Sequence, residues 1–234
     1  MRLDWVCSST SGRGSNESER GPAATLAGYL SSSSAYVWLC AFGTRCIRRA
    51  RLQSCWAERV LELAAGHGRD ALYFAKQGFT VLTSDFSSVA VAQIRRDARS
   101  ADLEPRIQAF VHDIREPLLL SRSSVDAVYA HMALCMALST SEIHRIVDEI
   151  HRVLRPNGMF VFTVRHSGDA HYRAGNSHGD DIFESGGFAV HFFTRQLLDD
   201  LANGWVCDEV HAFEEGELPR RLWRVTFRKD GSKL

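Results

Sequence analysis

Residues 59–87 constrain the fold of this 234-residue chain more than any other stretch. A short apolar run at 60–63 predicts a buried strand, and a turn of small residues that contains Gly66 and Gly68 follows it. Apolar residues at helical spacing then predict a helix, and a second predicted strand leads directly to Asp85. Such a unit suits a nucleoside, because small residues let backbone N–H groups approach a ligand and the Asp85 carboxylate can accept from ribose hydroxyls.

Two interpretations of the turn are open. Residues 66–71 match the dinucleotide fingerprint G-x-G-x-x-G/A, and Asp85 follows at nearly the expected distance. Glu62, at the end of the first predicted strand, favours a different ligand. Its carboxylate would repel an anionic pyrophosphate and would attract a cationic cofactor.

The pattern Glu62-x-Ala64-x-Gly66-x-Gly68 resembles motif I of the class I methyltransferases that depend on S-adenosylmethionine (SAM), (D/E)-x-G-x-G-x-G. SAM carries an ammonium and a sulfonium, which suits an acid at this point, and Ala64 replaces the first glycine of the motif. The resemblance implies SAM as cofactor. It also implies a doubly wound α/β fold with a mostly parallel seven-stranded sheet and an antiparallel last strand. The cofactor-binding positions implied in this stretch are Glu62, Ala64, Gly66, Gly68, Arg69, Asp85 and Phe86.

Acidic residues end three successive predicted strands. From residue 56 on, predicted strands and helices alternate, which is typical of an α/β fold, and the third strand is followed by Asp113 and Ile114. In the family that this chain resembles, an acid and an apolar neighbour at this point bind adenine, through its exocyclic amine and its ring face. Because the carboxyl ends of parallel strands line one crevice, Glu62, Asp85 and Asp113 are predicted to lie together.

The fourth predicted strand ends at His131, a position that faces the methyl donor in the fold that the resemblance implies. Residues 141–154 then predict an amphipathic helix, with apolar residues on one face. The turn at 155–158 resembles the L-x-P-G-G turn before the fifth strand of the family. Asn157 replaces a glycine there and tolerates the left-handed conformation, so the fifth strand is predicted to begin at Met159.

Residues 165–193 predict an insertion over the carboxyl edge of the sheet, where loops commonly contact substrates. The run Gly186-Gly187-Phe188, followed by Phe193-Thr194 at the start of a predicted helix, resembles the small-molecule methyltransferases of the tellurite-resistance type. The resemblance continues through Gly204-Trp205 and through Glu215-Gly216-Glu217-Leu218. The tellurite-resistance-type methyltransferases have a His-Arg pair at the positions where this chain has Pro219 and Arg220. The implied acceptor is a small molecule with a sulfur, nitrogen or oxygen nucleophile, or a metalloid oxyanion, and the candidate substrate contacts are His171, Tyr172 and Arg220.

Methyl transfer from a sulfonium is an in-line displacement, so the protein contributes mainly orientation and exclusion of water. A hydroxyl or ammonium acceptor would need a base. The candidates are His131, His166 and His191, because histidine titrates near neutral pH. An acceptor that is already an anion needs no base, and Arg220 or Arg173 could hold it electrostatically.

Composition limits the possible partners. The chain has 28 basic and 28 acidic residues and a pI of about 7.1, so we expect no nucleic-acid partner. No apolar run reaches the roughly 18–20 residues that span a bilayer, so we expect no membrane partner. The six cysteines show no C-x-x-C pair or metal-finger spacing, which predicts reduced thiols, a cytoplasmic protein and no metal site. The ending Ser232-Lys233-Leu234 matches a peroxisomal address as the alternative location.

Residues 1–55 are rich in serine, glycine and arginine, and we expect a poorly ordered extension before a SAM-dependent methyltransferase domain at 56–234. We expect a monomer or a homodimer. Three hypotheses remain: a small-molecule methyltransferase, an NAD-dependent Rossmann oxidoreductase, and a SAM-binding protein without catalysis. Glu62, the pair Asp113-Ile114 and the lack of a Tyr-x-x-x-Lys catalytic pair count against the oxidoreductase.

Overall fold

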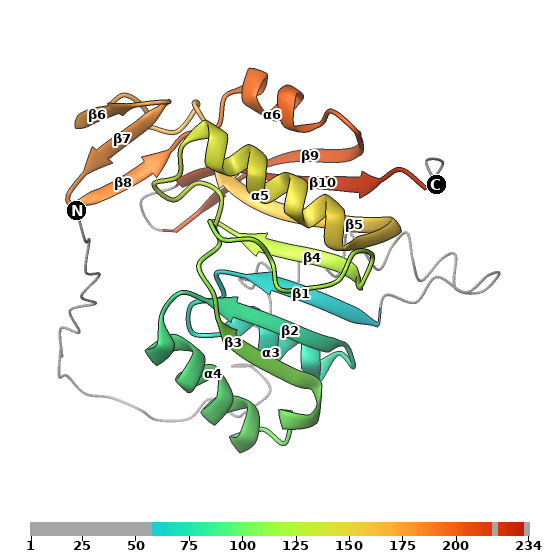
Figure 1. Cartoon of the computed structure of the whole chain (residues 1–234). Coiled ribbons are helices and arrows are strands. Elements are labelled where there is room, and N and C mark those ends of the chain that lie inside the picture. Colours follow the sequence, from blue (N-terminus) through green and yellow to red (C-terminus); the bar gives the residue numbers. More distant parts are fainter. Residues whose placement is uncertain (1–57, 217–219, 232–234) are drawn as a thin grey trace, which may run out of the picture.

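The computed structural model describes residues 58–216 and 220–231, and within them seven strands form one sheet (Figure 1). These strands are β1 (Arg59–Leu63), β2 (Thr80–Asp85), β3 (Ile107–Val111), β4 (Val125–His131), β5 (Leu154–Arg165), β9 (Trp205–Glu215) and β10 (Arg220–Lys229). Their order is β3-β2-β1-β4-β5-β10-β9, with β1 to β5 parallel and β10 antiparallel to both of its neighbours. The predicted mostly parallel sheet with an antiparallel last strand is confirmed. The expectation for residues 1–55 lies outside the described residues.

Helices cover both faces of the sheet. They are α3 (Arg69–Lys76), α4 (Ser88–Ser100), α5 (Thr140–Val153) and α6 (Arg195–Leu201). Successive strand residues point to opposite faces, so Leu61 packs in the cluster formed with α5 and α6, whereas Val60 packs with Phe74 of α3. The ring of Phe74 meets Tyr129 of β4 edge to face, with centroids 5.2 Å apart. Within the described part of the chain, no helix is both long and apolar enough to span a membrane.

The start of α5 and the turn after it follow from local sequence. The Ser139 hydroxyl accepts from the backbone N–H of Glu142, whose carboxylate accepts from the Ser139 N–H, and this capping box fixes the N-terminus of the predicted helix. β5 begins at Leu154, earlier than the predicted Met159, because its pairing with β4 continues across a register shift. Asn157 has φ 64°, so its predicted left-handed conformation is confirmed.

The insertion after β5 contains strands that the sequence pattern did not predict. These are β6 (Asn176–Gly179), β7 (Ile182–Ser185) and β8 (Phe188–His191), which form an antiparallel sheet beside the carboxyl ends of the parallel strands (Figure 1). The turns between them are Asp180-Asp181 and Gly186-Gly187, and all four of these residues have positive φ. Two successive positive φ values match the twist of a tight hairpin. Strands of four residues with polar or glycine positions give too weak an alternation to detect.

We expect Gly68→Ala to lower the free energy of unfolding by about 2–4 kcal/mol, because the added methyl group meets the buried Ile94 side chain and the backbone is left-handed. Gly68 has φ 77°, and a Cβ there would lie 2.5 Å from Ile94 Cγ1. Gly66→Ala is the matched control, since Gly66 has φ 55° and no atom within 4 Å of the place that its methyl group would take. Urea unfolding should give a loss of only about 1–2 kcal/mol for the control. Equal losses in the two variants would contradict the packing argument.

Candidate functional site

The loop between β1 and α3 is built from residues in the left-handed conformation. Ala64, Gly66 and Gly68 have φ values of 52°, 55° and 77°. A left-handed alanine costs roughly 1–2 kcal/mol, so the substitution of the first motif glycine leaves some strain at Ala64. Gly68 is the N-cap of α3, which makes this loop a run of backbone groups next to a helix N-terminus.

Asp85, the last residue of β2, holds this loop in place. Its Oδ2 accepts from the backbone N–H of Gly66 at 2.8 Å, and its Oδ1 accepts from the N–H of Ser87 at 2.9 Å. The residue is only 5% exposed. Each carboxylate oxygen has two acceptor positions, so both oxygens retain one for a ligand hydroxyl.

Glu62, in β1 just before the loop, is almost completely buried. It is 3% exposed, and its Oε2 accepts from the Thr83 hydroxyl at 3.0 Å. Burial, and after it the nearby Asp70 carboxylate, raise the pKa of Glu62 well above its usual value. The predicted contact of the Glu62 charge with a cationic cofactor stays a prediction, and within the protein this carboxylate is hydrogen-bonded to β2. Asp70 itself pairs with the neighbouring Arg69 at 3.3 Å.

The end of β3 places Asp113 and Ile114 on the same edge of the sheet. The backbone N–H of His112 donates to the Asp85 carbonyl at 2.9 Å, which joins this segment to the end of β2. The Asp113 carboxylate accepts from Arg115, and that hydrogen bond lowers the pKa of Asp113. Ile114 packs partly against the core, whereas Phe86 is 62% exposed beside Asp85.

His131, the last residue of β4, approaches side chains of β5 and of the end of β9. Its Nδ1 is 2.8 Å from the Thr163 hydroxyl oxygen, and that oxygen accepts from the backbone N–H of Met132. Its Nε2 is 3.7 Å from Glu215 Oε2. Burial lowers the pKa of His131, so the imidazole is neutral at neutral pH. With the proton on Nε2, the Thr163 hydroxyl can donate to Nδ1 while Nε2–H points toward the Glu215 carboxylate.

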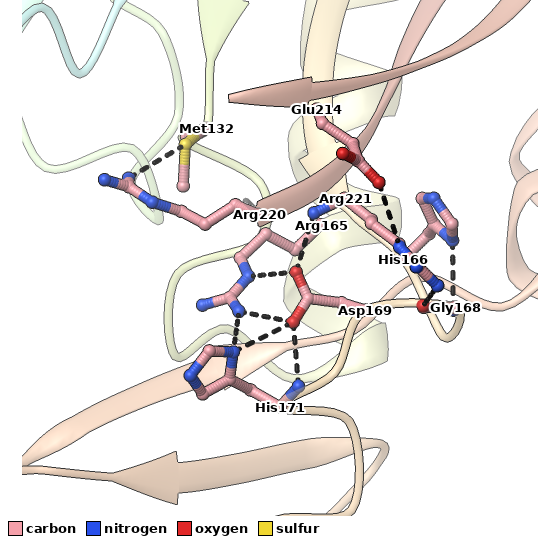
Figure 2. Close-up of polar contacts among 9 residues, drawn as sticks. All are labelled: Met132, Arg165, His166, Gly168, Asp169, His171, Glu214, Arg220 and Arg221. Atoms are coloured by element: carbon pink, nitrogen blue, oxygen red, sulfur yellow. Dashed lines mark hydrogen bonds and ion pairs between the residues drawn. The ribbon is translucent and has the colours of Figure 1, made fainter. Parts of the chain in front are cut away.

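A buried ion pair anchors the start of the insertion, as Figure 2 shows. Arg165 Nε and Nη2 donate to the two oxygens of Asp169 at 3.1 and 2.6 Å. The backbone N–H groups of His171 and Arg221 also donate to this carboxylate, which therefore joins the insertion to β10. Burial alone would raise the pKa of Asp169, but these hydrogen bonds hold it well below its usual range.

The remaining predicted histidines are engaged by neighbouring groups. His166 stacks on Trp223, with ring centroids 4.5 Å apart, and its Nδ1 accepts from the Gly168 N–H. His191 is 1% exposed, and its Nδ1 lies 2.7 Å from the Leu138 carbonyl oxygen, to which it donates. The Nδ1 of His171 lies 3.0 Å from Arg165 Nη2, so this ring extends the Asp169 network.

The other two candidate substrate contacts differ in accessibility. The Tyr172 hydroxyl donates to Asp181 at 2.8 Å, which joins the first part of the insertion to the turn between β6 and β7. Arg220 reaches toward Met132, with Nη1 3.9 Å from the thioether sulfur (Figure 2). That weak contact is the only hydrogen bond or ion pair of the Arg220 side chain within the described residues, so its charge remains available to a ligand.

Sequence reasoning missed Glu215, Thr163 and the pair formed by Arg165 and Asp169. Thr163 lies inside an apolar strand, and nothing local marks it as the partner of a histidine. The acid run before Gly216 is visible in the sequence, but the approach of Glu215 to His131 depends on how β9, β10 and β5 pair.

The described residues show no sign of a metal centre. Within 58–216 and 220–231, no three His, Cys, Asp or Glu side chains are arranged to hold an ion. Cys135 and Cys207 are the cysteines in that part of the chain, and both are free thiols. Burial raises the pKa of the Cys135 thiol to about 11, so it is protonated at neutral pH.

Comparisons with known proteins agree with this geometry. A family model described as a methyltransferase domain matches residues 60–158, which run from β1 into β5. An uncharacterised methyltransferase of Synechocystis sp. is 28% identical over 109 residues, which are 47% of this chain and 48% of that protein. A demethylmenaquinone methyltransferase of Beutenbergia cavernae is 37% identical over 117 residues, 49% of this chain and 45% of that protein. The chain thus spans about half the length of the curated relatives it matches.

The fold itself is found in solved methyltransferase structures. A SAM-dependent methyltransferase from Methanosarcina mazei superimposes with a TM-score of 0.64 and 21% identity, covering 79% of this chain and 97% of that one. At this identity the likeness shows the fold. The family match is to a methyltransferase domain and the structural likeness is to the fold, and neither singles out the tellurite-resistance-type branch.

We expect Asp169→Asn to lower the free energy of unfolding by about 3–5 kcal/mol, because it leaves the buried Arg165 guanidinium without its counterion. Asp199→Asn is the matched control, since Asp199 pairs with Arg195 at the same i,i+4 spacing but on the surface. Urea unfolding should show a loss below about 1 kcal/mol for the control. Similar small losses in both variants would contradict the anchoring role of Asp169.

We expect His131 to titrate below its usual value of about 6.5, because burial disfavours the imidazolium. A depressed histidine pKa contributes stability above the unfolded value, and this stability is lost as the pH falls through the folded value. Glu215 and Asp70 oppose the shift, whereas Arg69 and Arg220 add to it. Histidine-ring NMR from pH 4.5 to 8 should therefore show a still lower pKa in Glu215→Gln, and a raised one would contradict the assignment.

Proposed function

We propose that the protein transfers a methyl group from SAM to a small-molecule acceptor. The single observation that supports this most strongly is the hydrogen bond from the Gly66 N–H to the Asp85 carboxylate, which joins the glycine loop to the acid at the next strand end. This pairing forms a preorganised place for a ribose, and the methyltransferase-domain match covers both residues. The acceptor and its reacting atom go beyond that match and remain part of the proposal.

The residues proposed to hold SAM lie along the carboxyl edge of β1 to β4. Asp85 would accept hydrogen bonds from the ribose hydroxyls. Asp113 would accept one from the adenine amine, while its hydrogen bonds with Arg115 are either kept in part or broken. Phe86 and Ile114 offer apolar surface for the adenine ring, and exposed Phe86 has room for such a contact. The complete proposed set is Glu62, Ala64, Gly66, Gly68, Arg69, Asp85, Phe86, Asp113, Ile114 and His131. Glu62 acts in it from below, by supporting the loop.

When bound, SAM supplies an activated methyl group on a sulfonium, so this chain needs to supply mainly orientation and a dry site. Among the candidate bases, His131 is the one that lies at the tip of β4 beside the loop. Its Nδ1 lone pair faces the Thr163 hydroxyl, which makes it a weak base in this arrangement. His166 and His191 fit structural roles better, because their ring nitrogens bind backbone groups.

The acceptor is proposed to enter between the β6–β8 insertion and the start of β10. Arg220 offers a positive charge at this rim, and its contact with Met132 places it next to the tip of β4. His171 and Tyr172 are more restricted, because both already bind acidic residues of the insertion. Such a rim favours an acceptor that arrives as an anion, for which no base is required.

We expect the protein to bind S-adenosylhomocysteine (SAH) in isothermal titration calorimetry and to give no heat with NAD⁺. Asp85→Ala should weaken SAH binding about 10- to 100-fold, because hydrogen bonds to a charged acceptor contribute about 1.5–3 kcal/mol. Binding of NAD⁺ alone would overturn the proposal in favour of an oxidoreductase.

Asp126→Ala is the control for the structural effect of losing Asp85. The Asp126 carboxylate also accepts from two backbone N–H groups, those of Glu58 and Arg59, but at the opposite ends of the strands. Both variants should lose stability, and only Asp85→Ala should lose affinity for SAH. An equal loss of affinity in both variants would show that Asp85 acts through folding alone.

A further inference from the structure

The carboxylate of Glu215 is a partly buried charge without a cation of its own. Its side chain is 29% exposed at the end of β9. The only ionisable partner within 4.0 Å in the described part of the chain is His131 Nε2, at 3.7 Å. That distance is too long for a hydrogen bond. Because burial lowers the pKa of His131, this partner is neutral at neutral pH and does not balance the charge.

The strand register brings Glu215 to this place and leaves it unpaired. In the β9–β10 ladder Glu215 lies opposite Arg220, and Glu214 lies opposite Arg221. Neighbouring strand residues point to opposite faces, so the two acids have different surroundings. Glu214 forms an ion pair with Arg221 at 3.2 Å (Figure 2), whereas the Arg220 guanidinium turns toward Met132 instead of Glu215.

Charges of both signs therefore lie near the tip of β4. Arg69, the first residue of α3, lies within electrostatic range of both His131 and Glu215. Glu62 is enclosed beneath the loop, and Asp70 is paired with Arg69. Of these acids, Glu215 is the one that is neither enclosed nor paired with an arginine at ion-pair distance in the described residues, so its negative charge can act on a cationic ligand group.

We infer that Glu215 is the counterion of the SAM sulfonium and makes this site prefer SAM to SAH. The inference rests on the proposed function, since it requires SAM to lie against Arg69 and His131. In the transfer, the acceptor's lone pair would form a bond to the methyl carbon as that carbon's bond to sulfur breaks, and the electron pair of the broken bond would leave sulfur as a neutral thioether. Glu215 then loses its electrostatic partner, so the same residue that favours the cofactor also favours release of the product.

SAM and SAH allow a direct test, because they share the ammonium, carboxylate, ribose and adenine and differ in the charge on sulfur. Isothermal titration calorimetry on the full chain should show SAM binding weakened about 3- to 30-fold more than SAH binding in Glu215→Gln, as expected for one partly screened charge pair. Glu215→Asp should keep part of the preference. Raising the salt concentration should reduce the preference in the wild-type protein.

Glu214→Gln is the matched control, because it changes the adjacent acid on the other face and should leave both affinities unaltered. An equal loss for SAM and SAH in Glu215→Gln would overturn the inference in favour of contact with the shared ammonium or a structural role. Unchanged affinities would overturn it as well. If the wild-type protein bound neither ligand, the proposed function itself would fail, which is a distinguishable result.

Discussion

The carboxylate of Asp85 is the interaction on which the candidate site depends. One oxygen accepts from Gly66 in the loop after β1, and the other accepts from Ser87 at the start of α4. A single side chain thereby sets the position of the glycine loop and the direction of the next helix. Because both oxygens keep an acceptor position, a ligand can add hydrogen bonds to a carboxylate that is already ordered, which reduces the entropy lost on binding.

The acidic residues around this carboxylate differ in how deeply they are buried as well as in how close their partners lie. Glu62 has the residue type expected for a cationic cofactor, and it is almost completely buried and hydrogen-bonded to Thr83. Asp169 is enclosed too, but Arg165 balances its charge and the pair anchors the insertion to β10. Glu215 is partly exposed and lacks a cation in the described residues. These three acids differ in burial and in partners, although all three are carboxylates near the same edge of the sheet.

Local patterns were enough to predict the sheet, its parallel part and the acids at its strand ends. The apolar runs before Glu62 and Asp85 and the glycines between them form within about 30 residues, so no long-range information is needed. The pairing of His131 with Thr163 and Glu215 was not predictable in this way. It requires β4, β5, β10 and β9 to lie in one register, and that register depends on packing along the whole sheet. The hairpins of the insertion were missed because strands as short as Asn176–Gly179 have no clear alternation.

The sequence by itself determined the α/β class, the glycine loop and the positions of Asp85 and Asp113, because strand and helix periodicities and turn residues act over short distances. The tertiary structure alone decided which side chains are enclosed and which are paired with one another. It enclosed Glu62, brought Glu215 to His131 across the sheet and paired Arg165 with Asp169. The physical reason is that side-chain charge is encoded residue by residue. Whether a charged side chain is buried, and which side chain it pairs with, is decided only when strands that are distant in the sequence pack together.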